Sequence, residues 1–310
     1  MIAVITGANG FIGRHVCERF AADGWTVRPV VRRDIEQGRL GQLMSGADIV
    51  IHVAGATRAP NAALLRESNV ELTRRVVDLS RASGMRRLIF ISSQAAAGPA
   101  RSATEVVSEE TTPSPIEAYG RSKLDAERVV EAASGALEYV IIRPASVYGP
   151  GDRDFLAVFR LARLGVAVHP GNREQLISIV HVRDLVDAIA AAAGAVPVDS
   201  LDRTFFVAND EPVRWRELFR MAAECAGRTI VADVNLPRPL VAVGARVGDA
   251  VAAVRRRAGL LTTEKSLLAQ PSYWICSNER AKRELGFASR VHLAAGLRET
   301  YEWYVSNGWL

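Results

Sequence analysis

The sequence predicts an α/β fold with a doubly wound parallel sheet, followed by a smaller, mainly helical lobe. Apolar runs alternate with helix-like patterns through the first half of the chain. The runs at 48–54 and 87–92 are apolar on both faces, which is typical of strands covered by helices on each side. Beyond Tyr148-Gly-Pro-Gly151 the pattern loosens into helices joined by segments that contain glycine and proline.

The first half reads as a regular alternation of strands and helices. We expect strands at 2–6, 25–31, 48–54, 87–92 and 138–143, and helices at 11–22, 36–45, 62–83 and 117–134. The segment between Arg33 and Asp48 is too short for the helix, strand and second helix that usually complete this half of a Rossmann sheet. We therefore expect one strand to be missing and 25–31 to lie at the sheet edge, where the absent N–H of Pro29 is tolerated.

A glycine-rich turn follows the first strand. Gly7 permits a sharp turn, Gly10 lets the backbone approach a pyrophosphate, and Gly13 allows close packing of helix on strand. The next helix directs its free N–H groups and positive dipole end at the anion. Glycine-rich turns also occur in proteins that bind no ligand, so the turn alone is weak evidence for a dinucleotide site.

Two domains with an interleaved boundary are expected. Residues 1–148 and a return segment, 178–208, are predicted to form a dinucleotide-binding Rossmann domain. The return segment holds the end of a strand at 175–181, a helix at 183–193 and a strand at 204–208. Residues 149–177 and 209–310 are predicted to form the substrate-binding lobe.

Charge and hydropathy narrow the class of protein. The 310 residues are 49% hydrophobic with a mean hydropathy of +0.07, as in a globule with a sizeable core. The net charge is +5 and the pI about 9.4, but the arginines are scattered along amphipathic helices. We expect a small-molecule substrate and no nucleic-acid partner.

Cysteine usage and the N-terminus point to the cytoplasm. Cys17, Cys225 and Cys276 are far apart and lack metal-ligand spacing, so neither a disulfide framework nor a metal site is expected. An apolar strand begins at residue 2, without a charged leader, and no window holds 18 uninterrupted apolar residues. We expect a cytoplasmic protein that does not insert into a membrane.

A tyrosine, a lysine and a serine form the candidate catalytic group. Tyr119 and Lys123 are four residues apart, which places them on one face of a helix. A tyrosine with a pKa near 10 needs a nearby cation to lower that pKa, and Lys123 supplies it. Ser93 follows a predicted parallel strand, where open α/β sheets bind ligands. Each feature also has a purely structural interpretation, since such pairs occur by chance and a serine after a strand often caps a helix.

Taken together, these motifs resemble the extended short-chain dehydrogenase/reductase family, also called the epimerase/dehydratase group. The resemblance covers essentially the whole chain and is specific for the family but not for a substrate. It rests on Thr6 to Gly13, Asp48 to Gly55, Asn69-Val70, Ile91 to Ser93, Tyr119 to Lys123, Arg143 to Pro150 and His181 to Asp184.

The resemblance implies roles for individual residues. Tyr119 would be the general acid or base, Lys123 its electrostatic partner and a ligand of the nicotinamide ribose, and Ser93 a hydrogen-bond partner of the substrate oxygen. The dinucleotide would contact Tyr119 and Lys123, together with Gly7, Asn9, Gly10, Phe11, Ile12, Gly13, Ala54, Gly55, Ser92, Pro144 and Val147. The substrate would contact Gln94, Tyr148 and Arg153. Family members often form homodimers through the helices at 62–83 and 117–134, so a homodimer is expected.

The end of the second strand favours NADP over NAD. Members that use NAD usually have an acidic residue where this chain has Val31, followed by Arg32 and Arg33. Two guanidinium groups suit a 2′-phosphate. Asp34 is near enough to leave NAD as an alternative, and the two arginines are also compatible with a simple solvent-facing position.

Three functions remain open. The main hypothesis is reversible hydride transfer between NADP(H) and a ketone or secondary alcohol. It rests on several segments that resemble dihydroflavonol reductases and 3β-hydroxysteroid dehydrogenases. In addition, Ile177 stands where sugar-nucleotide epimerases commonly have an arginine. The small residues at 95–98 indicate either a roomy pocket or close packing. A nucleotide-sugar epimerase or 4-ketoreductase is the alternative, with four arginines available for a diphosphate: Arg153, Arg160, Arg163 and Arg173. The third hypothesis is a non-catalytic NADP-binding sensor.

Overall fold

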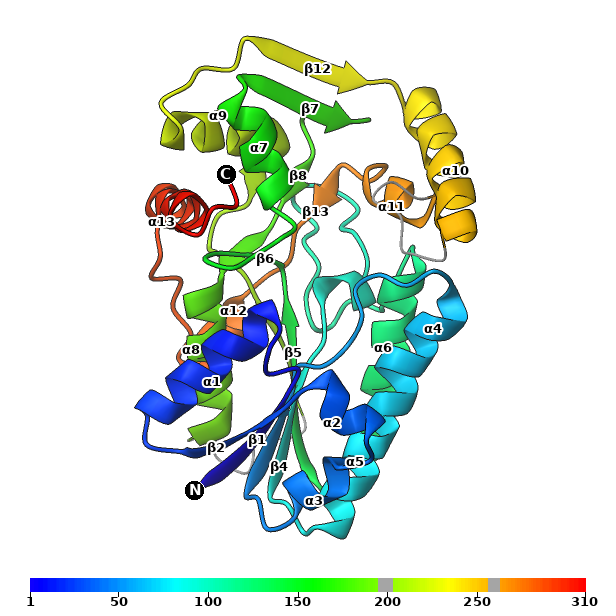
Figure 1. The fold of residues 1–310 in the computed structure, drawn as a ribbon, viewed down its shortest axis with the longest axis vertical. Helices are drawn as coiled ribbons and strands as arrows, with labels where there is room; N and C mark the ends of the chain where they lie inside the picture. Colours follow the sequence, from blue (N-terminus) through cyan, green and yellow to red (C-terminus); the bar gives the residue numbers. More distant parts are fainter. Residues whose placement is uncertain (195–202, 256–262) are drawn as a thin grey trace.

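A six-stranded parallel sheet forms the centre of the first lobe (Figure 1). The computed structural model describes residues 1–194, 203–255 and 263–310. The strand order is β10-β5-β4-β3-β1-β2, and every neighbouring pair is parallel. The strands are β1 (Ile2–Thr6), β2 (Thr26–Val30), β3 (Ile49–His52), β4 (Arg87–Ile91), β5 (Glu138–Pro144) and β10 (Arg203–Val207). The predicted doubly wound parallel sheet is confirmed.

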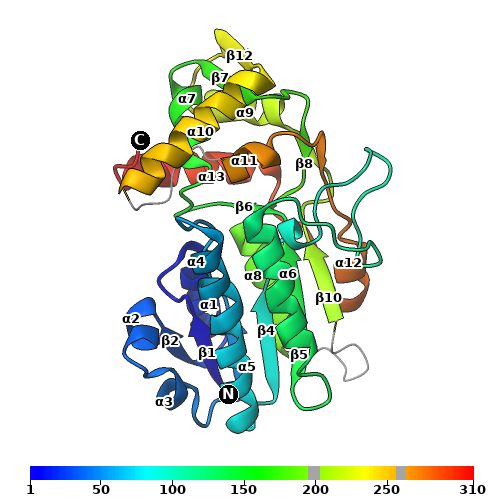
Figure 2. The same ribbon diagram turned by 90° about the vertical axis from the view of Figure 1, so that its right-hand side faces the viewer.

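Both faces of this sheet are buried, because alternate residues of each strand point to opposite sides. Ile5, Ile51 and Ile89 join one apolar cluster with α1 (Phe11–Ala22), α8 (Val182–Gly194) and α12 (Glu279–Leu285). Val4 and Val50 join the opposite cluster with α3 (Leu40–Met44), α5 (Leu72–Ala82) and α6 (Ala118–Glu131). Figure 2 shows α5 and α6 side by side on their face of the sheet.

The sheet ends at β2, as predicted from the short connection to the next strand. The segment between β2 and β3 holds the short helices α2 (Arg32–Glu36) and α3, where we expected one helix at 36–45. No strand forms in this fully described segment. Pro29 therefore lies on an edge strand, where its missing N–H leaves no gap in the ladder.

The predicted helix at 62–83 forms with one irregular turn. It consists of α4 (Ala62–Arg66), the π-helical turn η1 (Glu67–Glu71) and α5. Such π turns occur often at functional sites because they change which residues face a neighbour. The short 3-10 helix η2 (Gln94–Ala96) follows β4 and leads into the long connection to α6.

The rest of the described chain adds helices and three small sheets. Its helices are α7 (Leu156–Arg163), α9 (Trp215–Cys225), α10 (Arg238–Arg255), α11 (Thr263–Leu268) and α13 (Leu293–Ser306). Its strands are β6 (Ser146–Tyr148), β7 (Val166–Pro170), β8 (Leu176–Ile177), β9 (Ile179–His181), β11 (Val213–Arg214), β12 (Ala232–Leu236) and β13 (Tyr273–Trp274). They pair as β11-β8-β13, β12-β7 and β6-β9.

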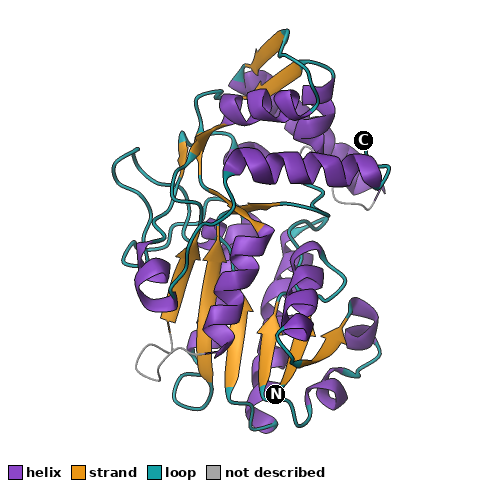
Figure 3. Cartoon of the chain, turned by 90° about the vertical axis from the view of Figure 1, so that its left-hand side faces the viewer, coloured by secondary structure: helices purple, strands orange, loops and turns teal. Residues whose placement is uncertain are grey.

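The segment at 178–208 contains α8, which packs on the large sheet, and β10, which forms one edge of it. The strand expected at 175–181 is instead split into β8 and β9, and neither joins the large sheet. Residues 195–202 of this segment lie outside the described residues. Among the described helices, none combines the length and apolar composition needed to span a bilayer. Figure 3 shows the large sheet's strands pointing toward the second lobe.

Candidate functional site

The candidate site lies where the carboxyl ends of the sheet strands face the second lobe (Figure 1). The glycine turn follows β1, and Gly7 has a φ of +71°. A Cβ on Gly7 would lie 2.9 Å from the backbone N of Ala54, and one on Gly13 would lie 2.1 Å from the carbonyl oxygen of Gly7. No side chain caps the N-terminus of α1. The turn therefore requires glycine and leaves helix N–H donors for an anion, which fits a dinucleotide pyrophosphate.

The loop after β3 forms the opposite wall of this turn. A Cβ on Gly55 would lie 2.9 Å from the side-chain oxygen of Asn69, so this glycine also permits a close approach. Asn69, in η1, accepts a hydrogen bond from the N–H of Ala56 (2.7 Å) and donates to the hydroxyl of Ser122 (2.8 Å). The π turn thus ties the loop to α6. From the sequence, Asn69 was identified only as part of the family motif, and its hydrogen bonds could not be predicted.

Ser93 and Tyr119 lie together at the carboxyl end of β4. The hydroxyl of Ser93 is close enough to that of Tyr119 to influence its pKa, although the two residues come from different elements. Glu117 caps α6 by accepting from the N–H groups of Tyr119 and Gly120, both at 2.6 Å. Burial raises the pKa of Tyr119 to about 12; the hydroxyl of Ser93 opposes this rise and the charge of Glu117 adds to it. The lowered tyrosine pKa that we expected from Lys123 is not found, and Tyr119 is a protonated donor at neutral pH.

Lys123 is buried one turn further along α6. Its ammonium donates to the carbonyl of Ile91 (2.7 Å) and lies 4.2 Å from the ring centroid of Phe90. Burial lowers the pKa of Lys123 to about 7, and the carboxylate of Glu127 opposes this. The charge on Lys123 is therefore sensitive to its neighbours near neutral pH.

Glu127, one turn after Lys123 on α6, forms a buried ion pair with Arg143. Both carboxylate oxygens of Glu127 accept from Arg143, at 2.9 and 2.6 Å, and Ser92 also donates to this carboxylate. Glu127 is fully buried. This pair was not predicted from the sequence, although Glu127 continues the four-residue spacing of Tyr119 and Lys123. Ser92, a residue expected to line the dinucleotide, thus uses its hydroxyl to bind this carboxylate.

His52 is a second buried titratable group close to Lys123. Its ring nitrogens are hydrogen-bonded to the hydroxyls of Thr6 (2.7 Å) and Thr73 (3.0 Å). Burial, assisted by the charge of Lys123, lowers the pKa of His52 to about 3. The imidazole is thus neutral at physiological pH and connects β1 to α5.

The second strand ends in exposed arginines and an engaged aspartate. Arg32 and Arg33 are exposed at the start of α2. Asp34 is buried, accepts from the N–H of Val31 (2.8 Å) and pairs with Arg39. Its carboxylate is therefore already used within the protein.

The three predicted substrate residues lie in different surroundings. Gln94 is buried, and its side-chain nitrogen has no hydrogen-bond partner within the described residues. Tyr148 is fully buried against Phe155. The guanidinium of Arg153 lies 5.1 Å from the ring centroid of Trp309, near the C-terminus. Only Gln94 therefore combines a position beside Ser93 with an unsatisfied polar group.

The other residues assigned from the resemblance can also be placed. Asn9 is exposed at the tip of the glycine turn, whereas Phe11 and Ile12 are half-buried in α1. Pro144 ends β5 and is buried, while Val147 lies in β6 and is half-buried. These positions are compatible with dinucleotide contacts along the carboxyl ends of the strands.

Most of the arginines considered for a diphosphate are engaged within the protein. Arg160 donates to the carbonyl of Trp309 (3.3 Å), and Arg173 pairs with Glu174 (3.7 Å). Arg163 is exposed on α7. Ile177 is buried in the second-lobe core. The described residues also contain no group of three or more His, Cys, Asp or Glu side chains placed to hold a metal ion.

Packing accounts for the small residues after Ser93. Ala97 and Ala100 belong to an apolar cluster, and a Cβ on Gly98 would lie 2.2 Å from the carbonyl oxygen of Ser114. A Cβ on Gly120 would lie 2.3 Å from the carbonyl oxygen of Ala95. Close packing, one of our two interpretations, is therefore observed.

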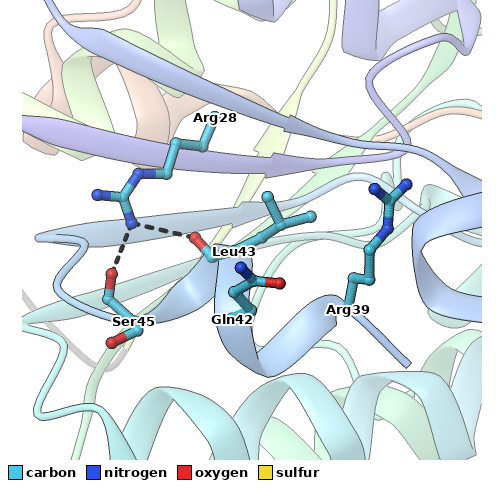
Figure 4. A pocket seen from close by; sticks show the side chains of 5 residues that line it. All are labelled: Arg28, Arg39, Gln42, Leu43 and Ser45. Atoms are coloured by element: carbon cyan, nitrogen blue, oxygen red, sulfur yellow. Dashed lines mark hydrogen bonds between the residues drawn. The ribbon is translucent and has the colours of Figure 1, made fainter. Parts of the chain in front are cut away.

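A separate hollow lies beside the edge strand β2 (Figure 4). Arg28 donates there to the carbonyls of Leu43 (3.2 Å) and Ser45 (2.5 Å), at the end of α3. Because Ser45 precedes β3, this hollow lies toward the amino ends of the strands. It is thus separate from the site around Tyr119, and Arg28 has a structural role as a helix cap.

Comparisons with known proteins agree with this geometry. The model of the NAD dependent epimerase/dehydratase family matches residues 3–204. A ceramide reductase of Caulobacter vibrioides (strain NA1000 / CB15N) is 29% identical, with 100% of this chain and 96% of that protein covered. A 4-hydroxy-2-methyl-3-oxo-4-farnesyl-3,4-dihydroquinoline-1-oxide ketoreductase of Stigmatella aurantiaca is 28% identical, with 96% and 95% covered. The solved structure of MoeE5 in complex with UDP-glucuronic acid and NAD has a TM-score of 0.79 and 25% identity, with 99% and 100% covered.

Proposed function

Because the chain belongs to the NAD dependent epimerase/dehydratase family, we propose that it is an NADP-dependent reductase that reversibly converts an apolar ketone into a secondary alcohol. The neighbouring hydroxyls of Ser93 and Tyr119, beside the glycine turn, are the observation that carries this proposal. A hydroxyl pair at this position suits a carbonyl oxygen that gains negative charge.

The protein's own groups would handle the proton. The bound dinucleotide supplies the hydride. Tyr119, protonated at neutral pH, donates its phenolic proton to the carbonyl oxygen, and Ser93 donates a second hydrogen bond to that oxygen. Lys123 stabilises the phenolate left behind while its ammonium is charged. Buried Asn69 and Glu127 hold α6, and hence Tyr119 and Lys123, in place.

Arg32 and Arg33 support NADP as the preferred dinucleotide. Both are exposed at the end of the strand that usually contacts the adenosine ribose. The carboxylate of Asp34, which follows them, is paired with Arg39 and caps α2, so it is poorly placed to accept from a ribose hydroxyl. NAD is the alternative, and it is the dinucleotide in the MoeE5 complex.

The substrate class is inferred from the relatives and from the second lobe. Ceramide and a farnesyl-bearing dihydroquinoline are both largely apolar, and both named relatives are reductases. The unsatisfied side-chain nitrogen of buried Gln94 would donate to a polar group next to the reacting carbon. We therefore propose a long-chain or polycyclic ketone.

A nucleotide-sugar epimerase or 4-ketoreductase is the second candidate. The similarity in fold to MoeE5 with its bound UDP-sugar favours it. Against it, Arg153 and Arg160 are engaged with Trp309, and Arg173 is paired with Glu174. A non-catalytic sensor would not need the complete set of Ser93, Tyr119 and Lys123, so we place it third.

The proposal extends to the organisation of the molecule. We assign 1–148 with 178–208 to dinucleotide binding, and 149–177 with 209–310 to substrate binding. A homodimer through the helices at 62–82 and α6 is proposed from the family resemblance. Unpaired cysteines at all three positions suit a reducing compartment such as the cytoplasm.

A substrate screen tests the proposal. Purified protein is incubated with NADPH or NADH and a panel of long-chain and polycyclic ketones, and the loss of reduced-nicotinamide absorbance is followed. We expect net NADPH consumption with at least one apolar ketone. Conversion of a UDP-sugar without net dinucleotide consumption would support the epimerase instead, and binding of NADPH without turnover of either class would support the sensor.

A further inference from the structure

An ion pair joins two loops that border the start of α1. Arg58, in the loop between β3 and α4, pairs with Asp154, in the loop between β6 and α7. The two residues are 96 positions apart in the chain. Figure 1 shows the first of these loops on the side of the first lobe that faces the second lobe. Neither residue is among those assigned to the dinucleotide or the substrate, so the ion pair needs a separate explanation.

The loop that carries Arg58 is held at both ends. At one end, the N–H of Ala56 donates to the side-chain oxygen of Asn69 (2.7 Å), and the carbonyl of Ala56 accepts from the side-chain nitrogen of the same residue (3.0 Å). At the other end, Asn61 caps α4 by accepting from the N–H of Leu64 (2.9 Å). Arg58 lies between these fixed points and is exposed. The guanidinium is therefore presented on a short loop whose ends are anchored to the first lobe.

The loop that carries Asp154 is held against the start of α1. A Cβ on Gly151 would lie 3.2 Å from a guanidinium nitrogen of Arg14 and 3.8 Å from the ring of Phe11, both in the first turn of α1. The carboxylate of Asp152, which is buried, accepts from the N–H of Asp154 (2.8 Å). This bond fixes the backbone from which the carboxylate of Asp154 reaches Arg58.

These contacts form a ring that includes the start of α1. The glycine turn approaches the loop after β3, since a Cβ on Gly7 would lie 2.9 Å from the backbone N of Ala54. That loop pairs with Asp154 through Arg58, and the loop of Asp154 returns to the first turn of α1. The N–H groups at the start of α1, which fit a pyrophosphate, therefore form one side of the ring, and the ion pair closes the other.

We propose that Arg58 and Asp154 form a clasp that closes over a dinucleotide bound at the start of α1 and slows its release. The inference rests on the proposed function, because it needs a bound dinucleotide. The clasp can open in each cycle, since the two side chains are 36% and 59% exposed and an exposed ion pair contributes little stability. A reductase needs such opening, because its oxidised dinucleotide leaves after every turnover.

Stopped-flow measurement of dinucleotide release tests the proposal. Protein loaded with NADPH, and separately with NADH, is mixed with an excess of the oxidised dinucleotide, and the change in nicotinamide fluorescence gives koff. We expect Arg58→Gln and Asp154→Asn each to raise koff by about two- to fivefold, the range for loss of an exposed ion pair. The double variant should release the dinucleotide no faster than either single variant, because both substitutions remove the same interaction.

Asp187→Asn is the matched control. Asp187 pairs with Arg19, so this ion pair also joins two elements, α1 and α8, but it involves the other end of α1. Both of its side chains are 36% exposed, so the substitution likewise removes an exposed carboxylate from an ion pair. The koff of Asp187→Asn should equal that of the wild type.

The proposal is overturned if neither single variant changes koff, or if Asp187→Asn raises it as much. It is also overturned if only one of Arg58→Gln and Asp154→Asn raises koff, because that side chain would then act on the dinucleotide without its partner. A wild type that binds neither NADPH nor NADH contradicts both the clasp and the proposed function. Binding without turnover of any ketone counts against the proposed reaction alone, and the koff values of the variants still decide whether the clasp exists.

Discussion

Replacing Glu127 by Gln should move the pH dependence of the enzyme. Lys123 supports reduction only while charged, so activity falls as the pH rises through its pKa, about 7 in the wild type. Side chains four residues apart on a helix are about 6 Å apart, and unit charges at that distance interact by about 3 kcal/mol at an effective dielectric constant of about 20, or about two pKa units. Since Arg143 shares the same carboxylate, we expect a shift of about one to two units toward lower pH.

The assay is the pH profile of kcat for NADPH-dependent ketone reduction. Glu127→Gln leaves Arg143 buried without its counter-charge, which costs about 3–5 kcal/mol of stability, so folding is checked by circular dichroism at each pH. Ser92→Ala is the matched control, because it removes a neutral donor to the same carboxylate without changing any charge. An unchanged alkaline limb in folded Glu127→Gln would refute the assigned role of this carboxylate.

Three further predictions concern the cofactor site and stability. Gly13→Ala should lower the free energy of unfolding by about 1–3 kcal/mol and weaken dinucleotide binding, because its Cβ would lie 2.1 Å from the carbonyl oxygen of Gly7. Gly41→Ala is the control, since its Cβ would have its nearest contact at 3.4 Å. Equal effects of the two substitutions in fluorescence titrations with the dinucleotide would contradict this prediction. Protonation of His52 in the unfolded state alone should lower the free energy of unfolding by about 1.4 kcal/mol per pH unit as the pH falls from 6.5 toward 3. Urea titrations at two pH values should therefore show a smaller difference for His52→Gln than for the wild type, and an equal difference would exclude His52 as the source. Replacing Arg32 and Arg33 by Ser should raise KM for NADPH about tenfold or more and leave KM for NADH nearly unchanged; equal changes in both would argue against a 2′-phosphate site.

Local patterns predicted the large sheet and the glycine turn. Buried strands and turn glycines follow from short-range sterics and apolar runs. The sheet, its edge at β2 and the need for glycine at Gly7 and Gly13 could therefore be predicted from the sequence. The split of 175–181 into β8 and β9 could not be predicted, because pairing partners such as β13 come from about 100 residues further along the chain.

The surroundings of the site residues depend on such distant contacts. Arg143 pairs with Glu127 only because β5 lies next to α6. Arg153 contacts Trp309 only because the C-terminal end of the chain packs beside it. The pKa of Tyr119 shows the same limit: spacing predicted a nearby cation, whereas burial raises this pKa. Residue types and spacing therefore identified the candidates, and burial, seen only in the fold, determines their charge state.

The role of Tyr119 as the proton donor is the central claim, and Tyr119→Phe tests it most directly. The rate of NADPH-dependent reduction of an accepted ketone is measured for both proteins, together with the Kd for NADPH. We predict that the rate falls by about 10²–10⁴-fold while NADPH binding is retained, because the substitution removes only the phenolic hydroxyl. Equal rates for Tyr119→Phe and the wild type would contradict the account.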